Sequence, residues 1–185
     1  MQIQVQELVN ALPDLNPDGM LIVAIDGCGG AGKSTIANEL ALEQGNSQVV
    51  HIDDFYKPKE RRVEIINDTP VHSNFEFDRL KQQVLEPLKH GSVTKYQTPD
   101  GEVVEVKPSG YVIVEGLGTL GTELKDYFDY KIWVDVLEVV RRQRGIERDT
   151  ADWANIWDNE YLPQDARYVK EQSPQKEADL VVNND

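Results

Sequence analysis

Short apolar runs rich in β-branched residues recur along the chain, separated by polar and amphipathic segments. Runs with the length and composition of buried parallel strands occupy residues 21–25, 48–52, 111–114, 130–134 and 178–182. Segments with helical patterns cover residues 2–12, 35–43, 78–89 and 136–148. This alternation predicts an α/β fold in which a mostly parallel five-stranded sheet is flanked by helices in three layers.

Turn-forming residues predict where some of these elements end. Asp78 is placed to cap a helix that Gly91 terminates. Thr98-Pro99-Asp100-Gly101 separates two short β-rich runs and predicts a hairpin insertion at about residues 92–107. The polar segment 57–74 lacks periodicity, and we expect a mobile loop there. Because 185 residues suit a single domain, we expect residues 1–185 to form one.

The segment after the first predicted strand carries a phosphate-binding motif. Residues 26–35 read D-G-C-G-G-A-G-K-S-T and fit the Walker A pattern G-x-x-x-x-G-K-[ST] between a strand and a helix. In this pattern, backbone N–H groups and a helix N-terminus with about half a positive charge bind phosphate oxygens. Lys33 would reach the β- and γ-phosphates and Ser34 would ligate Mg²⁺. The candidate nucleotide-binding residues are Gly27, Cys28, Gly29, Gly30, Ala31, Gly32, Lys33, Ser34 and Thr35.

Acidic residues follow two other predicted strands. Asp53 and Asp54 come after the second strand and Glu115 after the third, at the sheet edge where open α/β sheets bind ligands. Two adjacent acids can also be an ordinary helix cap and turn. An acid directly after a hydrophobic strand is the placement of a metal-linked carboxylate in kinases that use this loop. Glu115 is therefore a candidate Mg²⁺ residue.

The net charge and the single cysteine limit the partners. A formal charge of −14 argues against nucleic-acid binding, which needs a basic face. Lys and Arg gather at residues 57–62 and 141–148, where they are either solvated surface or contacts to a polyphosphate. Cys28 has no second cysteine to pair with, and no stretch approaches the roughly 18 apolar residues of a membrane span. We expect a cytoplasmic protein without membrane partners, and a homo-oligomer is left open.

Several motifs in this order resemble the uridine kinase, phosphoribulokinase and pantothenate kinase family of P-loop small-molecule kinases. The resemblance spans roughly residues 21–182. It is carried by the phosphate loop, the D-D-F-Y sequence at 53–56, N-F-E at 74–76, Tyr96 in the hairpin, I-V-E-G at 113–116, and the arginine-rich segment ending E-R-D at 147–149. The resemblance implies a P-loop NTPase fold of the nucleoside and nucleotide kinase type, with ATP and Mg²⁺ as cofactors.

The family's residue roles transfer to matching positions of this sequence. The resemblance implies that Asp53 accepts the proton of the substrate hydroxyl and approaches Mg²⁺ together with Ser34 and Glu115. Tyr56, Glu76 and Tyr96 fall where relatives line the acceptor pocket. Arg144 and Arg148 are the candidate catalytic arginines of a lid at about residues 141–149, although their spacing departs from the usual lid pattern. Trp153, Trp157, Tyr161 and Tyr168 favour core or interface packing over ligand stacking.

The leading interpretation is an ATP-dependent phosphotransferase that phosphorylates the primary hydroxyl of a small metabolite, with uridine or cytidine first. The nearest alternative is a kinase of a non-nucleoside alcohol such as a sugar, a phosphoribulose-like compound or pantothenate. No His follows Tyr96 in the hairpin, where uridine kinases place one that reads the base. A GTPase-like switch lacks the N-K-x-D sequence that reads guanine. Retention of Lys33, Ser34, Asp53 and Glu115 speaks against an inactive nucleotide-binding regulator.

Overall fold

A parallel sheet forms the centre of the computed structural model, which describes residues 5–16, 19–65 and 69–185. Its strands are β1 (Met20–Asp26), β2 (Ser47–His51), β5 (Gly110–Glu115), β6 (Tyr130–Asp135) and β7 (Leu180–Asn183), in the spatial order β2-β5-β1-β6-β7. Every neighbouring pair is parallel, so the predicted five-stranded sheet is confirmed. All five carboxyl ends therefore lie along one edge, which is where the phosphate loop begins.

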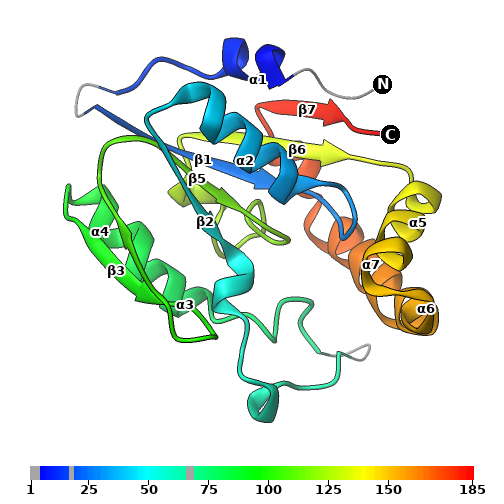
Figure 1. Cartoon of the computed structure of the whole chain (residues 1–185). Coiled ribbons are helices and arrows are strands. Elements are labelled where there is room, and N and C mark those ends of the chain that lie inside the picture. The colour runs from blue at the N-terminus through cyan, green and yellow to red at the C-terminus, as the bar shows by residue number, and fades with distance from the viewer. Residues whose placement is uncertain (1–4, 17–18, 66–68) are drawn as a thin grey trace.

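Alternate residues of β1 face two different hydrophobic layers. Leu21, Val23 and Ile25 pack with α1 (Val5–Ala11) and α2 (Lys33–Gln44) on one face. Met20, Ile22 and Ala24 pack on the other face against α3 (Phe77–Leu80), α4 (Glu86–Lys89) and α7 (Leu162–Gln172). Figure 1 shows these helices on the two sides of the sheet. Burial of β1 on both faces explains its uninterrupted apolar sequence, and the predicted three layers are confirmed.

Two helical segments contain a widened turn just before a proline. A π-helical turn at Lys81–Leu85 precedes Pro87, and a second at Trp157–Tyr161 precedes Pro163. Proline has no N–H, and its ring clashes with the carbonyl four residues earlier, so the regular α-helical ladder cannot continue through it. The Thr94 hydroxyl instead donates to the Gln83 carbonyl, which would otherwise bond residue 87. The predicted helix at 78–89 is thus α3, a π turn and α4.

Other predicted elements are confirmed with small shifts in their limits. The hairpin consists of β3 (Thr94–Gln97) and β4 (Val103–Val106), paired antiparallel. The helix with the arginines is α5 (Glu138–Asp149), followed by the short α6 (Ala154–Ile156). Asp78 does not cap α3, because the helix begins one residue earlier. The start of the predicted helix at 2–12 and residues 66–68 of the predicted loop lie outside the described residues.

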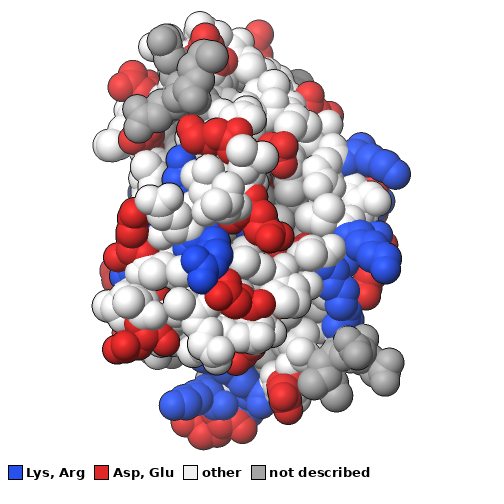
Figure 2. Space-filling view, turned by 90° about the vertical axis from the view of Figure 1, so that its right-hand side faces the viewer, with Lys and Arg blue, Asp and Glu red and all other residues white. Residues whose placement is uncertain are grey.

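The side of the molecule that carries α5, α6 and α7 lies beyond the carboxyl ends of β1 and β6 (Figure 1). Figure 2 shows this side, where acidic and basic side chains are interspersed over the middle and basic side chains gather along the right-hand edge. Among the helices that the structure describes, none is both long enough and apolar enough to cross a bilayer.

Candidate active site

The phosphate loop occupies the turn between β1 and α2. Gly30 and Gly32 have φ angles of 76° and 88°, in the left-handed region that favours glycine. A Cβ on Gly30 would lie 2.5 Å from the Arg141 carbonyl oxygen, so α5 also demands glycine there. The Lys33 ammonium donates to the Cys28 carbonyl at 3.1 Å and so curls over the loop. Burial raises the pKa of the Cys28 thiol to about 12, which makes it an unreactive filler.

Two buried acids brace this loop from behind. Asp26 accepts hydrogen bonds from the Gly27 N–H at 2.7 Å, the Leu120 N–H at 2.7 Å and the Tyr168 hydroxyl at 2.7 Å. Asp165 accepts from the Gly29 N–H at 2.9 Å. Because Tyr168 and Asp165 both lie on α7, this helix fixes the loop at its start and at its tip. Burial raises the pKa of Asp26 despite the hydrogen bonds it accepts.

The predicted metal-linked groups gather at the adjacent strand ends. The Ser34 hydroxyl donates to Glu115 Oε1 at 3.0 Å, and His51 Nδ1 lies 2.6 Å from the same oxygen. Asp53 is exposed, yet the surrounding protein displaces part of the water around its carboxyl, and this desolvation raises the pKa of that group. The negative charge of Glu115 raises it further. Lys33 opposes this rise. The hydrogen bond between His51 and Glu115 raises the pKa of the imidazole, and the negative charge of Glu115 adds to the rise.

These side chains fit part of an Mg²⁺ coordination shell. They offer a hydroxyl and two carboxylates, the oxygen donors that Mg²⁺ prefers. Among the residues that the structure describes, no cluster of three or more His, Cys, Asp or Glu side chains could enclose a metal by itself. Mg²⁺ in kinases usually keeps several waters and takes phosphate oxygens, with one or two protein carboxylates. A partial protein shell is therefore the arrangement expected for a metal that arrives with ATP.

One cavity of about 540 Å³ brings half of the predicted site residues together. Its volume lies within the roughly 300–1,000 Å³ of small-molecule sites. Residues predicted from the sequence that line it are Gly29, Gly30, Lys33, Ser34, Asp53, Tyr56, Glu115 and Arg148. Asp54 does not line it: its carboxylate accepts from the Tyr96 hydroxyl at 2.9 Å. Of the two adjacent acids, only Asp53 therefore lines the cavity.

Tyr96 and Glu76 lie outside the lining of this cavity. Tyr96 is 3% exposed and packs its ring 4.9 Å from that of Phe55. The Glu76 carboxylate is held by two arginines, with Arg79 Nε at 3.0 Å and Arg61 Nη2 at 2.8 Å. Both residues therefore have partners within the protein.

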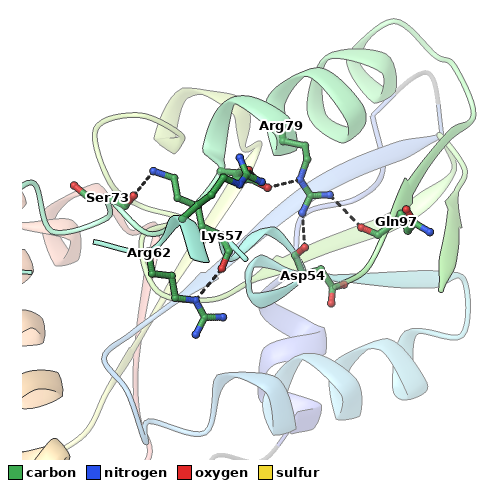
Figure 3. A network of polar contacts seen from close by, with 8 residues as sticks. Asp54, Lys57, Arg62, Ser73, Arg79 and Gln97 are labelled. Atoms are coloured by element: carbon green, nitrogen blue, oxygen red, sulfur yellow. Dashed lines mark hydrogen bonds and ion pairs between the residues drawn. The ribbon is translucent and has the colours of Figure 1, made fainter. Parts of the chain in front are cut away.

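Arg79 connects α3 to the turn that carries Asp54 and to the hairpin. Figure 3 shows its guanidinium donating to the Asp54 and Gln97 carbonyl oxygens. It also stacks over the Phe55 ring at 4.3 Å. Nearby, Lys57 donates to the Ser73 carbonyl and Arg62 donates to the Lys57 carbonyl (Figure 3). Arg79 and Glu76 thus belong to a network of contacts within the protein that joins α3 to the turn at Asp54 and to the hairpin.

The arginines of α5 have different partners. Arg141 is 6% exposed and donates to Asp165 at 2.7 Å and to the Gly29 carbonyl at 3.2 Å. Arg142 pairs with Asp158 on the surface, and Arg144 donates to the Asn184 carbonyl at 2.7 Å. Arg148 lines the cavity while pairing with Asp149 at 2.6 Å. Of the two predicted lid arginines, the structure brings only Arg148 to the cavity.

The sequence missed part of the lining on the α6 and α7 side. Trp153, Trp157, Tyr161, Gln164 and Asp165 line the cavity, although Trp157 is only 1% exposed; Tyr168 is buried and does not line it. The preference for packing therefore describes Tyr168 and most of the Trp157 ring, but Trp153 and Tyr161 do face the cavity. A signal was present, because residues 161, 164, 165 and 168 recur at the spacing of one helical face.

Comparison with known proteins places the chain in a family. A family model described as the phosphoribulokinase / uridine kinase family matches residues 22–183. A uridine kinase from Clostridium novyi is 30% identical over 88% of this chain and 86% of the relative. A structure described as a possible uridine kinase from Bacillus stearothermophilus has a TM-score of 0.70 at 22% identity, with 96% of each chain covered.

A second solved structure with the same fold is that of a kinase named for a different phosphate acceptor, D-glycerate. D-glycerate 3-kinase from Cryptococcus neoformans has a TM-score of 0.64 at 16% identity, with 99% of this chain and 96% of that chain covered. At such identities the two structures establish the fold alone, whereas the family model spans most of the sequence. The chain therefore belongs to the phosphoribulokinase and uridine kinase family of ATP-dependent kinases.

Proposed function

We propose that this kinase transfers the γ-phosphoryl group of ATP to the primary hydroxyl of a nucleoside, with uridine or cytidine as the first candidates. The observation that supports this most directly is the cavity that Lys33, Ser34, Asp53 and Glu115 line together at the carboxyl edge of the sheet. The relative from Clostridium novyi named a uridine kinase supports the choice of acceptor. Cytosolic action with Mg²⁺ is part of the same proposal.

Each side chain has a role that follows from its position. Lys33 neutralises phosphate charge at the loop, and Arg148 adds a second cation at the cavity. Asp53 lines the cavity and accepts the proton of the acceptor hydroxyl. Ser34, Asp53 and Glu115 would hold Mg²⁺, which when bound offsets the negative charge of the transferring phosphoryl group.

The structure gives no support to an acceptor-binding role for Glu76. Its carboxylate oxygens already accept from Arg61 and Arg79, and it is not part of the cavity lining. We therefore leave this role out of the proposal. Tyr56 lines the cavity and pairs edge-on with Phe75 at 4.8 Å, which places an aromatic contact near the acceptor.

A sugar or pantothenate-like alcohol is the competing acceptor, because this fold also occurs in a D-glycerate 3-kinase. The test is kcat/KM measured with ATP across uridine, cytidine, adenosine, ribose, D-glycerate and pantothenate. We expect a pyrimidine nucleoside to give the highest value. A higher value for an acceptor without a base would overturn the nucleoside proposal while leaving the kinase assignment intact.

A further inference from the structure

The hairpin makes no contribution to the cavity in the described part of the chain. None of the lining residues comes from β3, β4 or the turn between them. Tyr96 is buried, and its hydroxyl is committed to Asp54. Acceptor recognition must therefore come from other elements that do line the cavity.

The segment from α6 to α7 supplies an aromatic wall. Trp153 is 41% exposed, and Tyr161 is half-buried with its ring 5.3 Å from that of Trp157 in an edge arrangement. Burial raises the pKa of the Tyr161 hydroxyl, and the nearby Tyr56 contributes to the rise. Tyr56 lines the same cavity but comes from the segment after β2, so the two tyrosines approach it from different parts of the chain. Flat aromatic surfaces of this kind bind a planar ring better than they bind a polyol.

A polar group without a protein partner lies beside this wall. Gln164 lines the cavity and is half-buried, and no hydrogen bond involving its side chain occurs within residues 5–16, 19–65 and 69–185. Asn74, the other amide of the lining, is by contrast fully engaged. Its side chain exchanges two hydrogen bonds with the Val63 backbone, at 2.8 Å and 2.9 Å. Gln164 is therefore the amide that is available to a ligand.

We propose that Trp153, Tyr161 and Gln164 form the acceptor-ring subsite of this enzyme, in which the aromatic side chains contact a planar base and the amide hydrogen-bonds its polar edge. This inference rests on the proposed nucleoside kinase activity and specifies how the base is read. An amide presents one donor and one acceptor side by side. Uracil offers N3–H and a carbonyl, and cytosine offers N3 and an amino group, so either base can pair after rotation of the amide. The subsite therefore fits both pyrimidine nucleosides.

The test compares acceptor selectivity in three subsite variants and a hairpin control. For Gln164→Ala we expect kcat/KM for uridine to fall about tenfold, the effect of losing one buried hydrogen bond. For Trp153→Ala we expect a loss of similar size, and Trp153→Phe should restore most of it because an aromatic face returns. KM for ATP should stay within about twofold in all three. Tyr96→Phe should leave uridine kinetics unchanged, because its hydroxyl does not reach the cavity.

Phosphorylation of ribose serves as a reference reaction that tests the subsite separately from the proposed function. The ratio of kcat/KM for uridine to that for ribose is measured in each protein, since ribose lacks the ring. Collapse of this ratio in Gln164→Ala and Trp153→Ala, but not in Tyr96→Phe, supports the subsite. Full selectivity in both Ala variants, or a loss confined to Tyr96→Phe, overturns the subsite alone. A wild-type enzyme that uses no nucleoside overturns the proposed function and the subsite with it.

Discussion

The buried ion pair between Arg141 and Asp165 carries a quantitative prediction. The side chains are 8% and 4% exposed, and Arg141 Nη1 lies 2.7 Å from Asp165 Oδ2. Removing one member of such a pair leaves an uncompensated buried charge, which typically costs about 3–5 kcal/mol. Because a domain has only about 5–15 kcal/mol of stability, we expect Arg141→Met to lose a large share of the free energy of unfolding.

The same change should weaken ATP binding. Asp165 accepts from the Gly29 N–H. Burial raises the pKa of its carboxyl, and the nearby positive charges of Arg141 and Lys33 oppose that rise. In Arg141→Met this carboxylate would face the incoming triphosphate without its counter-ion. We expect at least a tenfold loss of affinity, because about 1.4 kcal/mol of repulsion has that effect.

The assay is urea unfolding together with calorimetric binding of a non-hydrolysable ATP analogue. Asp165→Asn keeps an oxygen that can accept from Gly29, so the double variant Arg141→Met, Asp165→Asn should be more stable than the sum of the single losses predicts, by about 2–3 kcal/mol. Arg142→Met is the matched control on the same helix. Its salt bridge to Asp158 is exposed, with 41% and 42% of the side chains accessible, and its removal should have little effect.

Two results would refute this reasoning. A cost below about 1 kcal/mol for Arg141→Met, or strict additivity in the double variant, would show that the pair is not a coupled buried unit. Unchanged stability with reduced ATP affinity would instead make Arg141 a phosphate-binding lid residue.

Four further predictions test the catalytic assignments and the fold. Lys33→Met should lower kcat by orders of magnitude with a smaller loss of ATP affinity, and an unchanged rate in the folded variant would contradict its role. Asp53→Asn should bind ATP yet transfer almost no phosphoryl group, whereas Asp54→Asn should be milder; steady-state kinetics would expose an exchange of the two roles. Burial lowers the pKa of His72 to about 4, so its neutral imidazole contributes fully to stability above pH 6.5, and this contribution is lost as the pH falls towards 4. Between these pH values the free energy of unfolding in urea should fall by about 3 kcal/mol more in the wild-type protein than in a His72→Leu variant. Residues 141–149 should gain hydrogen-exchange protection with an ATP analogue if they close as a lid, and equal protection in both states would contradict closure.

The strands and the phosphate loop could be predicted because their signals are local. A strand buried on both faces must be apolar throughout, and the loop needs glycine at positions fixed by its own backbone. The limits of helices were harder to predict where a proline interrupts them. Pro87 follows a π turn, and the Gln83 carbonyl that it leaves without a helical donor accepts instead from the Thr94 hydroxyl, 11 residues away. Helical periodicity does not encode that partner.

Pairings between distant residues could not be read from the sequence. Arg141 and Asp165 are 24 residues apart, and nothing in the arginine-rich segment distinguishes the buried guanidinium from its exposed neighbours. Glu76 matched a family position, but its two arginine partners depend on how α3 meets the loop before it. Gly145 is another such case: a Cβ there would lie 2.0 Å from the Trp157 ring, so the glycine exists to admit an indole 12 positions later.

One stretch of helix links the two halves of the reaction. Asp165 and Tyr168 hold the phosphate loop through Gly29 and Asp26, while Tyr161 and Gln164 line the cavity that we assign to the acceptor. Because these four residues share one helical face, a rotation or shift that improves contact with a new acceptor would also displace the groups that brace the loop. Acceptor preference should therefore change at low cost through Trp153, which lies outside this helix, and only at a cost in ATP binding through residues 161–168.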